Sequence, residues 1–175
     1  MLSVRGLEQY YGGSHTLRSI DLEVPAGTCT ALMGRNGVGK TTLLRCLVGE
    51  LPVRSGSVQL GGEDVTVLPS YERARRGMGY VPQGREIFSR LTVSENLTVG
   101  ESAAGGGATM DRTELEELFR SLAGKHSLVV VEHDMHFVDS IASKVTVLHE
   151  GRVLAQGSMD AIREDPRVID VYLGR

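Results

Sequence analysis

The sequence GRNGVGKTT, residues 34–42, decides the fold that we expect for this chain. It follows an apolar run, TCTALM at residues 28–33, and it precedes LLRCLV at residues 43–48, a run that favours a helix. The junction fits the pattern G-x-x-x-x-G-K-[ST]. An ordinary glycine turn between a strand and a helix is the alternative, but four fixed residue types with the correct flanks argue against it. Strand, glycine-rich loop and helix in this order indicate a phosphate-binding loop.

Each residue type in this loop has a physical reason to be there. Gly34, Gly37 and Gly39 allow positive φ angles, so successive backbone N–H groups can point inward around a phosphate chain. A helix that begins near Lys40 directs its positive dipole end at the same anion. Lys40 adds a full charge for the β- and γ-phosphates, and the Thr41 hydroxyl is placed to ligate Mg²⁺. The stretch therefore predicts a nucleoside triphosphate site.

Length and composition are those of one globular domain. The chain has 175 residues, of which 41% are hydrophobic, and its 19 basic and 22 acidic side chains give a net charge of −3. A nucleic-acid-binding protein usually carries a basic surplus, so we expect no nucleic-acid partner. Cys29 and Cys46 both lie in apolar runs, which favours buried thiols over a disulfide. The start of the chain has no signal segment and no apolar run is long enough to span a bilayer, so we expect any membrane role to depend on a partner.

The amino-terminal part reads as short strands and turns around the loop. Ile20–Val24 alternates apolar and acidic residues, as in a half-buried strand. Tyr10 and Tyr11 are neighbours, so on a strand one ring would pack inward and the other would stay exposed. An exposed tyrosine here is either a rim residue or a ring on which adenine stacks, and the sequence leaves both open. Residues 57–60 predict a further strand, and the arginines of 71–76 predict the solvated face of a short charged helix.

The carboxyl-terminal part begins after residues 101–112, a glycine-rich stretch without periodicity. Residues 127–131, SLVVV, are apolar throughout and predict a parallel strand that is buried on both faces. Ligands bind at the carboxyl ends of strands in open α/β sheets, which makes His133, just after this strand, a candidate site residue. The remaining predicted elements are an amphipathic helix around residues 115–122, a helix at 135–142, a hairpin of 144–148 with 152–157, and a helix at 163–173.

By its motifs the chain resembles the ATP-binding subunits of ABC transporters, specifically those of urea and branched-chain amino-acid importers. Residues 10–58, YYGGSHTLRSIDLEVPAGTCTALMGRNGVGKTTLLRCLVGELPVRSGSV, and 79–97, GYVPQGREIFSRLTVSENL, are similar to the urea-type subunit. Residues 127–158, SLVVVEHDMHFVDSIASKVTVLHEGRVLAQGS, and the final VYLGR resemble its sister subunit more. The resemblance implies an α/β fold, a P-loop NTPase of ABC ATPase type. Its central sheet would be mostly parallel, with an antiparallel N-terminal subdomain and a truncated helical subdomain and core.

The resemblance also implies roles for individual residues. Tyr11 matches the adenine-stacking aromatic, Gln83 the Q-loop glutamine that senses Mg²⁺ and the attacking water, and His133 the switch histidine that contacts the γ-phosphate. Gln83 and His133 are thus the expected catalytic residues, Thr41 and Gln83 the expected metal ligands, and ATP and Mg²⁺ the cofactors. A metal pair of His133 and His136 is the competing idea, but no third His or Cys ligand is close in sequence. The expected nucleotide-binding residues are Tyr11, Gly34, Asn36, Gly37, Gly39, Lys40, Thr41 and Thr42.

Part of the family pattern is missing from the sequence: the L-S-G-G-Q signature, the apolar strand that ends in Asp-Glu, and the D-loop. We expect residues 1–100 to be the first part of the nucleotide-binding domain, 101–112 a flexible junction at an internal deletion, and 113–175 the last part. A join between two sister subunits is the alternative explanation for the missing segment. In the family the aspartate holds Mg²⁺ and the glutamate activates water, so the resemblance implies weakened nucleotide·Mg²⁺ binding and impaired hydrolysis. Two absent strands would also leave a sheet edge or an apolar surface exposed.

The expected partners follow from the resemblance. They are the transmembrane permease subunits of an importer, contacted through residues 83–95, and a sister or identical ATP-binding subunit in a head-to-tail dimer. The location would be peripheral, at the cytoplasmic face of the inner membrane, without direct insertion. A small P-loop kinase is the first alternative, although the chain has no acceptor motif beside its arginine cluster. A non-catalytic remnant that binds nucleotide or nothing is the second.

Overall fold

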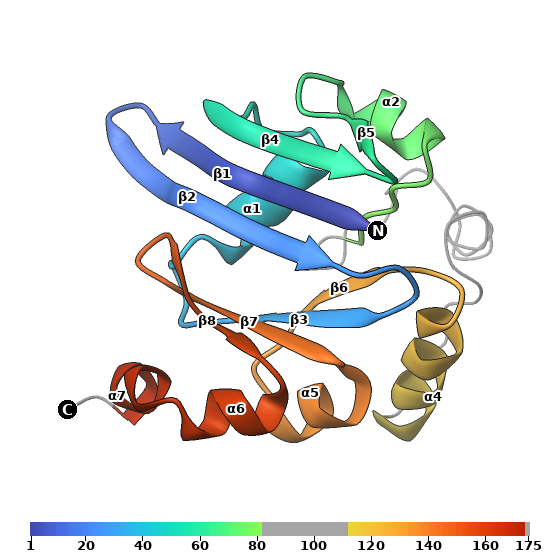
Figure 1. Cartoon of the computed structure of the whole chain (residues 1–175), viewed down its shortest axis with the longest axis vertical. Helices are drawn as coiled ribbons and strands as arrows, with labels where there is room; N and C mark the ends of the chain where they lie inside the picture. Colours follow the sequence, from blue (N-terminus) through green and yellow to red (C-terminus); the bar gives the residue numbers. More distant parts are fainter. Residues whose placement is uncertain (82–111, 174–175) are drawn as a thin grey trace, which may run out of the picture.

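A computed structural model describes residues 1–81 and 112–173, which form two sheets with helices between and below them (Figure 1). One sheet contains β1 (Leu2–Tyr11), β2 (Ser14–Val24), β4 (Ser55–Leu60) and β5 (Glu63–Asp64) in the antiparallel order β2-β1-β4-β5. The other contains β3 (Cys29–Met33), β6 (Leu128–Val131), β7 (Lys144–His149) and β8 (Arg152–Gly157) in the order β6-β3-β7-β8. An antiparallel amino-terminal sheet beside a mostly parallel central one confirms the predicted fold class.

Strand β3 is the centre of the second sheet. All of its residues are buried, because it runs parallel between β6 on one side and β7 on the other. The run TCTALM therefore forms a strand as predicted, and a fully covered strand needs no polar alternation. The predicted hairpin is also confirmed, since β8 returns antiparallel to β7.

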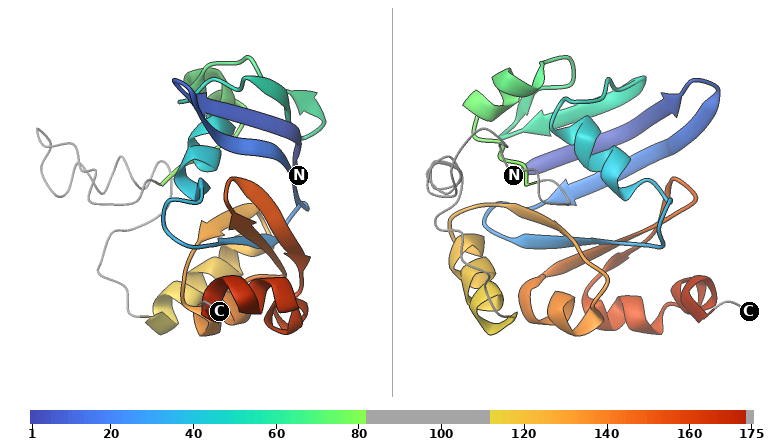
Figure 2. Two further views of the ribbon diagram at one scale, coloured as in Figure 1. Left: turned by 90° about the vertical axis from the view of Figure 1, so that its left-hand side faces the viewer. Right: turned by 180° about the vertical axis from the view of Figure 1, so that it is seen from behind.

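Six described helices connect and cover the sheets (Figures 1 and 2). They are α1 (Lys40–Leu47), α2 (Ser70–Arg75), α4 (Arg112–Ala123), α5 (Met135–Ile141), α6 (Met159–Glu164) and α7 (Pro166–Leu173). Helix α1 packs between the two sheets, whereas α4 to α7 lie along the far face of the second sheet. The single terminal helix predicted at 163–173 is wrong. Asp165 is extended (φ −69°, ψ 115°), and Pro166 restarts the chain as the first residue of α7, a position where its missing N–H is not needed.

The hydrophobic core has two parts, one on each side of the second sheet. The larger part joins the inner face of the antiparallel sheet to α1 through residues such as Leu7, Ile20 and Leu43. The smaller part lies between the second sheet and the last helices, and includes Met33 and Val168. Helix α4 is held by an edge-to-face contact of Phe119 with Phe137 of α5, with ring centroids 5.9 Å apart. The sheets therefore fix β3 and the segment that follows it from both sides.

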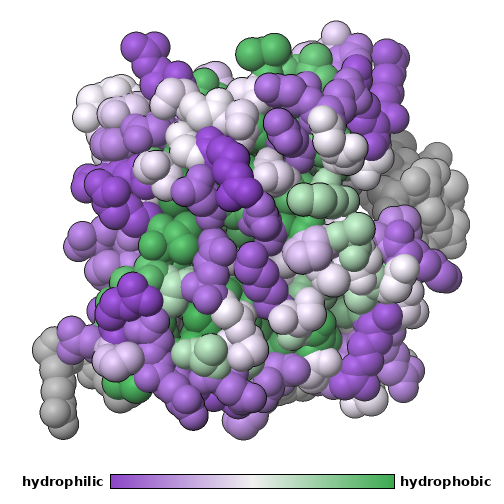
Figure 3. Space-filling view, in the orientation of Figure 1, coloured by the Kyte–Doolittle hydropathy of each residue, from purple (hydrophilic) through white to green (hydrophobic). Residues whose placement is uncertain are grey.

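Strand β6 differs from the prediction in its burial. Its residues are half-buried rather than covered on both faces, because among the described strands β6 pairs with β3 alone. One backbone edge of β6 therefore has no partner strand among the described residues. On the side drawn in Figure 3, hydrophilic residues cover most of the surface and hydrophobic ones form separate patches.

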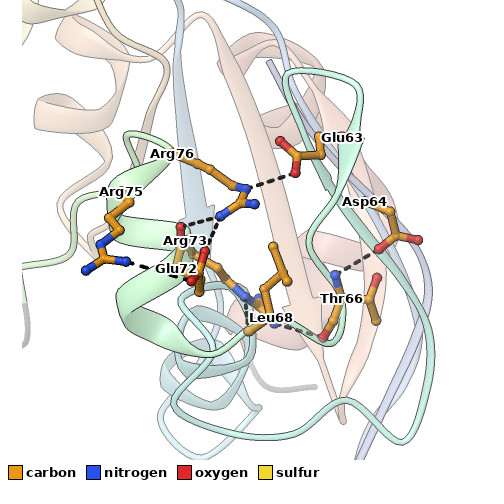
Figure 4. Close-up of polar contacts among 8 residues, drawn as sticks. All are labelled: Glu63, Asp64, Thr66, Leu68, Glu72, Arg73, Arg75 and Arg76. Carbon is orange, nitrogen blue, oxygen red and sulfur yellow. Dashed lines mark hydrogen bonds and ion pairs between the residues drawn. The ribbon is translucent and has the colours of Figure 1, made fainter.

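The prediction of a solvated arginine face on residues 71–76 is wrong for Arg73. Arg75 and Arg76 are exposed, but Arg73 is only 2% exposed. Its guanidinium donates to four backbone carbonyls at 2.6–2.9 Å: those of Cys46, Leu47, Thr66 and Leu68. Figure 4 shows the bonds to Thr66 and Leu68. The first two are at the carboxyl end of α1, where the helix dipole is negative. Arg73 therefore links α2 to α1.

Candidate phosphate-binding site

The phosphate loop connects the carboxyl end of β3 to α1, as the sequence predicts. Lys40 is the first residue of α1 and is 7% exposed. Its ammonium group donates to the carbonyl oxygens of Gly34 at 2.7 Å and Arg35 at 2.8 Å, so the side chain folds back across the loop. Burial lowers the pKa of Lys40 from its ordinary value. A buried cation that donates to carbonyl oxygens is a favourable partner for an anion such as phosphate.

Two glycines of the loop have no room for a side chain. Gly34 has φ 142°, and a Cβ there would lie 2.4 Å from the carbonyl oxygen of Leu148 on β7. Gly39, at the amino end of α1, has φ 107°, and a Cβ would lie 2.7 Å from Cδ2 of Leu17 on β2. The loop is thus pressed between the two sheets, and only glycine fits these positions.

The rest of the loop is open to solvent. Asn36, Gly37 and Thr41 are exposed, and Thr42 is half-buried. The backbone N–H groups of the first turn of α1 point away from the helix, and its dipole adds positive potential at this end. Exposed amides, a helix amino terminus and a buried lysine in one loop fit the phosphates of a nucleotide.

His133 lies at the same edge of the second sheet as the phosphate loop. Leu32 of β3 pairs with Val131 of β6, so Gly34 and His133 each follow two residues beyond that pair on adjacent parallel strands. The His133 side chain is exposed, while its backbone N–H donates to Glu132 at 2.9 Å. Asp134 then caps α5 by accepting from the backbone N–H groups of the first helical turn. The carboxyl ends of the parallel strands thus bring these two predicted site residues together.

The tyrosine pair lies on the hairpin of β1 and β2, with a different arrangement from the predicted one. Both rings are exposed, Tyr10 to 38% and Tyr11 to 46%. The strict alternation fails because the register of β1 against β2 shifts near this end of the hairpin. Tyr10 stacks on His15, with ring centroids 4.2 Å apart and planes at 8°, whereas Tyr11 has no ring partner among the described aromatics. Since Leu17 of the same hairpin contacts Gly39, Tyr11 is on a hairpin that reaches the phosphate loop.

Of the two predicted metal ligands, Thr41 and Gln83, the described residues include one. Gln83 lies outside the described residues, so the Thr41 hydroxyl is the one predicted metal ligand that the structure places. Within 1–81 and 112–173, no three His, Cys, Asp or Glu side chains gather as a metal site would require. Mg²⁺ usually needs one or two carboxylates together with phosphate oxygens. Thr41 and the nucleotide would therefore have to supply most of the coordination from this part of the chain.

Sequence reasoning missed the residues that hold the loop from outside. Leu17, Leu148 and Gly151 contact it across the fold, and the Gly151 N–H donates to the Val38 carbonyl at 3.2 Å. No local pattern reveals such contacts, although the sequence predicts the hairpin of 144–148 with 152–157 whose turn contains Gly151. Within the described ranges, no helix is both long and apolar enough to cross a membrane.

Comparison with known proteins agrees with this geometry. Residues 17–160 match the family described as ABC transporter, and residues 152–175 match the family described as Branched-chain amino acid ATP-binding cassette transporter. Among solved structures, the chain is similar to MJ1267, an ATP-binding cassette of an ABC transporter, with a TM-score of 0.83 and 19% identity over 99% of each chain. At that identity the likeness supports the fold.

Among curated relatives, the chain is 39% identical to a probable ABC transporter ATP-binding protein of Azorhizobium caulinodans, covering 99% of this chain and 83% of the relative. It is 29% identical to BraG of Pseudomonas aeruginosa, a high-affinity branched-chain amino acid transport ATP-binding protein, over 99% and 100% of the two chains. It is 26% identical to LptB of Acidithiobacillus ferridurans, a lipopolysaccharide export system ATP-binding protein, over 99% and 97%. The chain therefore belongs to the ABC transporter family and is the ATP-binding subunit of a transporter.

Proposed function

We propose that this chain is the ATP-binding subunit of an importer for branched-chain amino acids or urea, with impaired hydrolysis on its own. The observation that carries the proposal is the phosphate loop, in which a buried Lys40 and an open helix amino terminus converge. The carboxyl-terminal match at residues 152–175 and the relatives BraG and BraF support amino-acid import. The proposal that urea is the transported solute rests on the resemblance of residues 10–58 to the urea-type subunit. The LptB relatives favour export of another substrate as the second candidate.

In this proposal the nucleotide contacts residues from three parts of the fold. Tyr11 stacks on adenine, and Lys40 exchanges its carbonyl partners for the β- and γ-phosphates. The other loop residues, Gly34, Asn36, Gly37, Gly39 and Thr42, supply backbone and side-chain donors. Thr41 and Gln83 hold Mg²⁺, which balances phosphate charge when bound, and His133 contacts the γ-phosphate. The roles of the loop and of His133 are supported by their position at the same edge of the second sheet.

The impaired hydrolysis follows from what the sequence lacks. The sequence contains no apolar run that ends in Asp-Glu, so it lacks the residue type that activates the attacking water in the family. The alignment with BraG has 232 positions, against 175 residues in this chain, which supports an internal segment without a counterpart here. The half-buried residues of β6 also support an internal segment without a counterpart in this chain. General-base help is worth about 10²–10⁴-fold in rate.

The proposed partners are the permease subunits of the importer and a second ATP-binding subunit, at the cytoplasmic face of the membrane. Since this chain lacks the signature sequence, a complete sister subunit could cover its nucleotide, but it could not cover the partner's. Membership of the ABC family favours this arrangement over a small P-loop kinase.

One assay separates these functions. Labelled ATP and Mg²⁺ are mixed with the purified chain, and bound label, free phosphate and transfer to an acceptor are scored. We expect bound ATP with little free phosphate. Rapid phosphate release would contradict the impaired hydrolysis, transfer would select a kinase, and absence of bound label would select the non-binding remnant.

The transported solute needs a separate experiment in cells. Uptake of labelled leucine and of labelled urea is compared in cells with and without the encoding gene. Loss of leucine uptake alone would select the branched-chain amino-acid importer, and loss of urea uptake alone the urea importer. Unchanged uptake of both would overturn the proposal of import.

A further inference from the structure

Three side chains near the tip of the β1–β2 hairpin, at the upper left of Figure 1, contact one another beside Tyr11. Tyr10 and His15 are direct cross-strand partners, and their rings stack with centroids 4.2 Å apart. Nε2 of His15 lies 2.8 Å from a carboxylate oxygen of Glu8, close enough for an ion pair with the protonated imidazole but not aligned for a hydrogen bond. The Tyr10 hydroxyl donates to the same oxygen at 3.3 Å. Glu8, Tyr10 and His15 thus form one closed group, the hairpin cluster.

Farther along β2, other contacts hold the hairpin against the phosphate loop. The Arg18 N–H donates to the carbonyl of Gly151 at 2.7 Å, and the Gly151 N–H donates to the carbonyl of Val38 in the loop at 3.2 Å. Leu17 fills the space beside Gly39, where a Cβ would lie 2.7 Å from its Cδ2 atom. These contacts use no side chain of the hairpin cluster. The placement of this part of the hairpin beside the loop therefore does not depend on the cluster.

The tip of the hairpin leaves the Tyr11 ring exposed next to a turn of two glycines. A Cβ at Gly12 or Gly13 would meet no atom within 4 Å, so the turn is not packed against the rest of the fold. Glycine also loses more conformational freedom on folding than any other residue. Tyr11 belongs to the cross-strand pair directly after that of Tyr10 and His15. The stack is therefore placed to fix the strand ends that carry the Tyr11 ring.

A stacked cross-strand pair stabilises the strand ends on which it lies. We propose that Tyr10 and His15 are positioning residues that hold Tyr11 in place for stacking on adenine, with Glu8 fixing the imidazole. This inference rests on the proposed ATP binding. The cluster acts through the strand ends and does not need to touch the nucleotide. It should therefore affect ligands that contain a base and leave unaffected those that consist of phosphates alone.

Two probes separate these contributions: a non-hydrolysable ATP analogue and inorganic tripolyphosphate, each with Mg²⁺. Both present a triphosphate to the loop, but only the analogue presents adenine to Tyr11. Calorimetry gives both dissociation constants for the wild type and for Tyr10→Thr, which removes the stack and keeps a residue that favours strands. We expect Tyr10→Thr to bind the analogue about 2- to 10-fold more weakly, the range for one aromatic pair, and to bind tripolyphosphate as the wild type does.

Further variants test how Tyr10 acts. Tyr11→Thr should weaken binding of the analogue by about 5- to 150-fold, the range for stacking of one base. In that background Tyr10→Thr should have no further effect, because the ring that it positions is already absent. Tyr10→Phe keeps the stacked ring and should recover most of the affinity. Tyr71→Thr is the control that should bind both probes as the wild type does, because Tyr71 is 60% exposed on α2.

The outcomes distinguish this inference from the function on which it rests. If the wild type binds neither probe, the proposed function fails and the positioning fails with it. If the wild type binds the analogue and Tyr10→Thr binds it equally well, the positioning alone is overturned. An equal loss for both probes in Tyr10→Thr would also overturn it, because the cluster would then only stabilise the fold. An undiminished loss in the Tyr11→Thr background would overturn it too, because Tyr10 would then contact the nucleotide itself.

Discussion

Lys40 combines burial with a set of backbone hydrogen bonds. Its ammonium group is nearly buried, and burial alone would favour the neutral form of a lysine. The carbonyls of Gly34 and Arg35 offset this cost by accepting hydrogen bonds from it. Phosphate oxygens can replace those carbonyls with full negative charge. The contacts with these two carbonyls therefore hold the cation in a fixed place in the loop.

Gly34→Ala tests how tightly the loop is held between the sheets. The added Cβ would lie 2.4 Å from the backbone carbonyl of Leu148, and φ 142° is strained for alanine. We expect the free energy of unfolding to fall by about 1–3 kcal/mol or more, and ATP binding to weaken. Gly124→Ala is the control, because a Cβ there meets no atom within 4 Å and its φ is not positive. Equal urea midpoints for the two variants would contradict the observed contact.

Cys29 and Cys46 give a prediction with a pH dependence. Both thiols are buried and free, as the sequence predicts, and burial raises the pKa of each to about 11. A raised thiol pKa favours the neutral form in the folded chain. Its contribution to stability is therefore complete below the ordinary value of 9.0 and is lost as the pH rises through about 11. Nearby Arg73 and Arg45 oppose part of the shift at Cys46.

At pH 8 we expect alkylation of both thiols to be about 100-fold slower in the folded chain than in urea, since two pKa units reduce the thiolate fraction by that factor. Mass spectrometry of the alkylated peptides measures both rates. Rapid labelling of the native chain would show that these thiols are accessible, against the structure.

Helices α1 and α2 are linked through Arg73, the residue of α2 that is buried. Arg73 donates to carbonyls at the end of α1 and in the segment before α2, whereas Arg76 and Glu72 pair on the exposed side (Figure 4). Burial lowers the pKa of Arg73, and a guanidinium remains charged under all ordinary conditions. Because α1 begins at Lys40, Arg73 stabilises the phosphate loop from the opposite end of its helix.

Arg73→Met should therefore destabilise the chain strongly. The substitution keeps a long apolar stem but removes hydrogen bonds to four backbone carbonyls, two of them buried and two part-buried, so we expect the free energy of unfolding to fall by about 3–5 kcal/mol. Arg75→Met, on the exposed face of the same helix, should change it by less than about 0.5 kcal/mol. Urea unfolding followed by circular dichroism measures both. Similar losses for the two variants would show that the buried guanidinium has no special role.

Much of the whole molecule could be predicted from local patterns. The strand before residue 34, the helix after Gly39, the hairpin of β7 and β8 and the apolar β6 each have a periodicity or a turn that sequence reveals. The loop itself combines glycine spacing with one lysine, so its position and chemistry were predictable together. Neighbouring parallel strands then required His133 to lie near the loop.

What could not be predicted depends on contacts between distant segments. Arg73 looked solvated because its neighbours are charged, and only the fold brings the end of α1 above it. Strand β6 looked fully buried because its sequence is apolar, but its burial depends on a neighbouring strand on each side. The predicted role of Gln83 and the junction at 101–112 remain predictions, since they fall almost wholly outside the described residues.

Hydrolysis tests whether the chain acts as a complete ATPase. We expect its steady-state phosphate release to be about 10²–10⁴-fold slower than that of BraG measured in parallel, because the sequence lacks the strand ending in Asp-Glu that supplies the general base in the family. A phosphate-release assay at saturating ATP and Mg²⁺ gives both rates. Comparable rates would mean that another group of the chain activates the water, which would contradict the impaired hydrolysis.

The most direct test of the phosphate loop is a calorimetric titration with ATP. It compares the wild type with Lys40→Met and with the control Lys125→Met. Lys40 is buried in the loop, whereas Lys125 is exposed after α4. We predict saturable binding to the wild type and to Lys125→Met, and about 10- to 100-fold weaker binding to Lys40→Met, the loss expected for a hydrogen bond to a charged group. Binding that is absent from the wild type, or equally strong in Lys40→Met, would contradict a phosphate site built around this lysine.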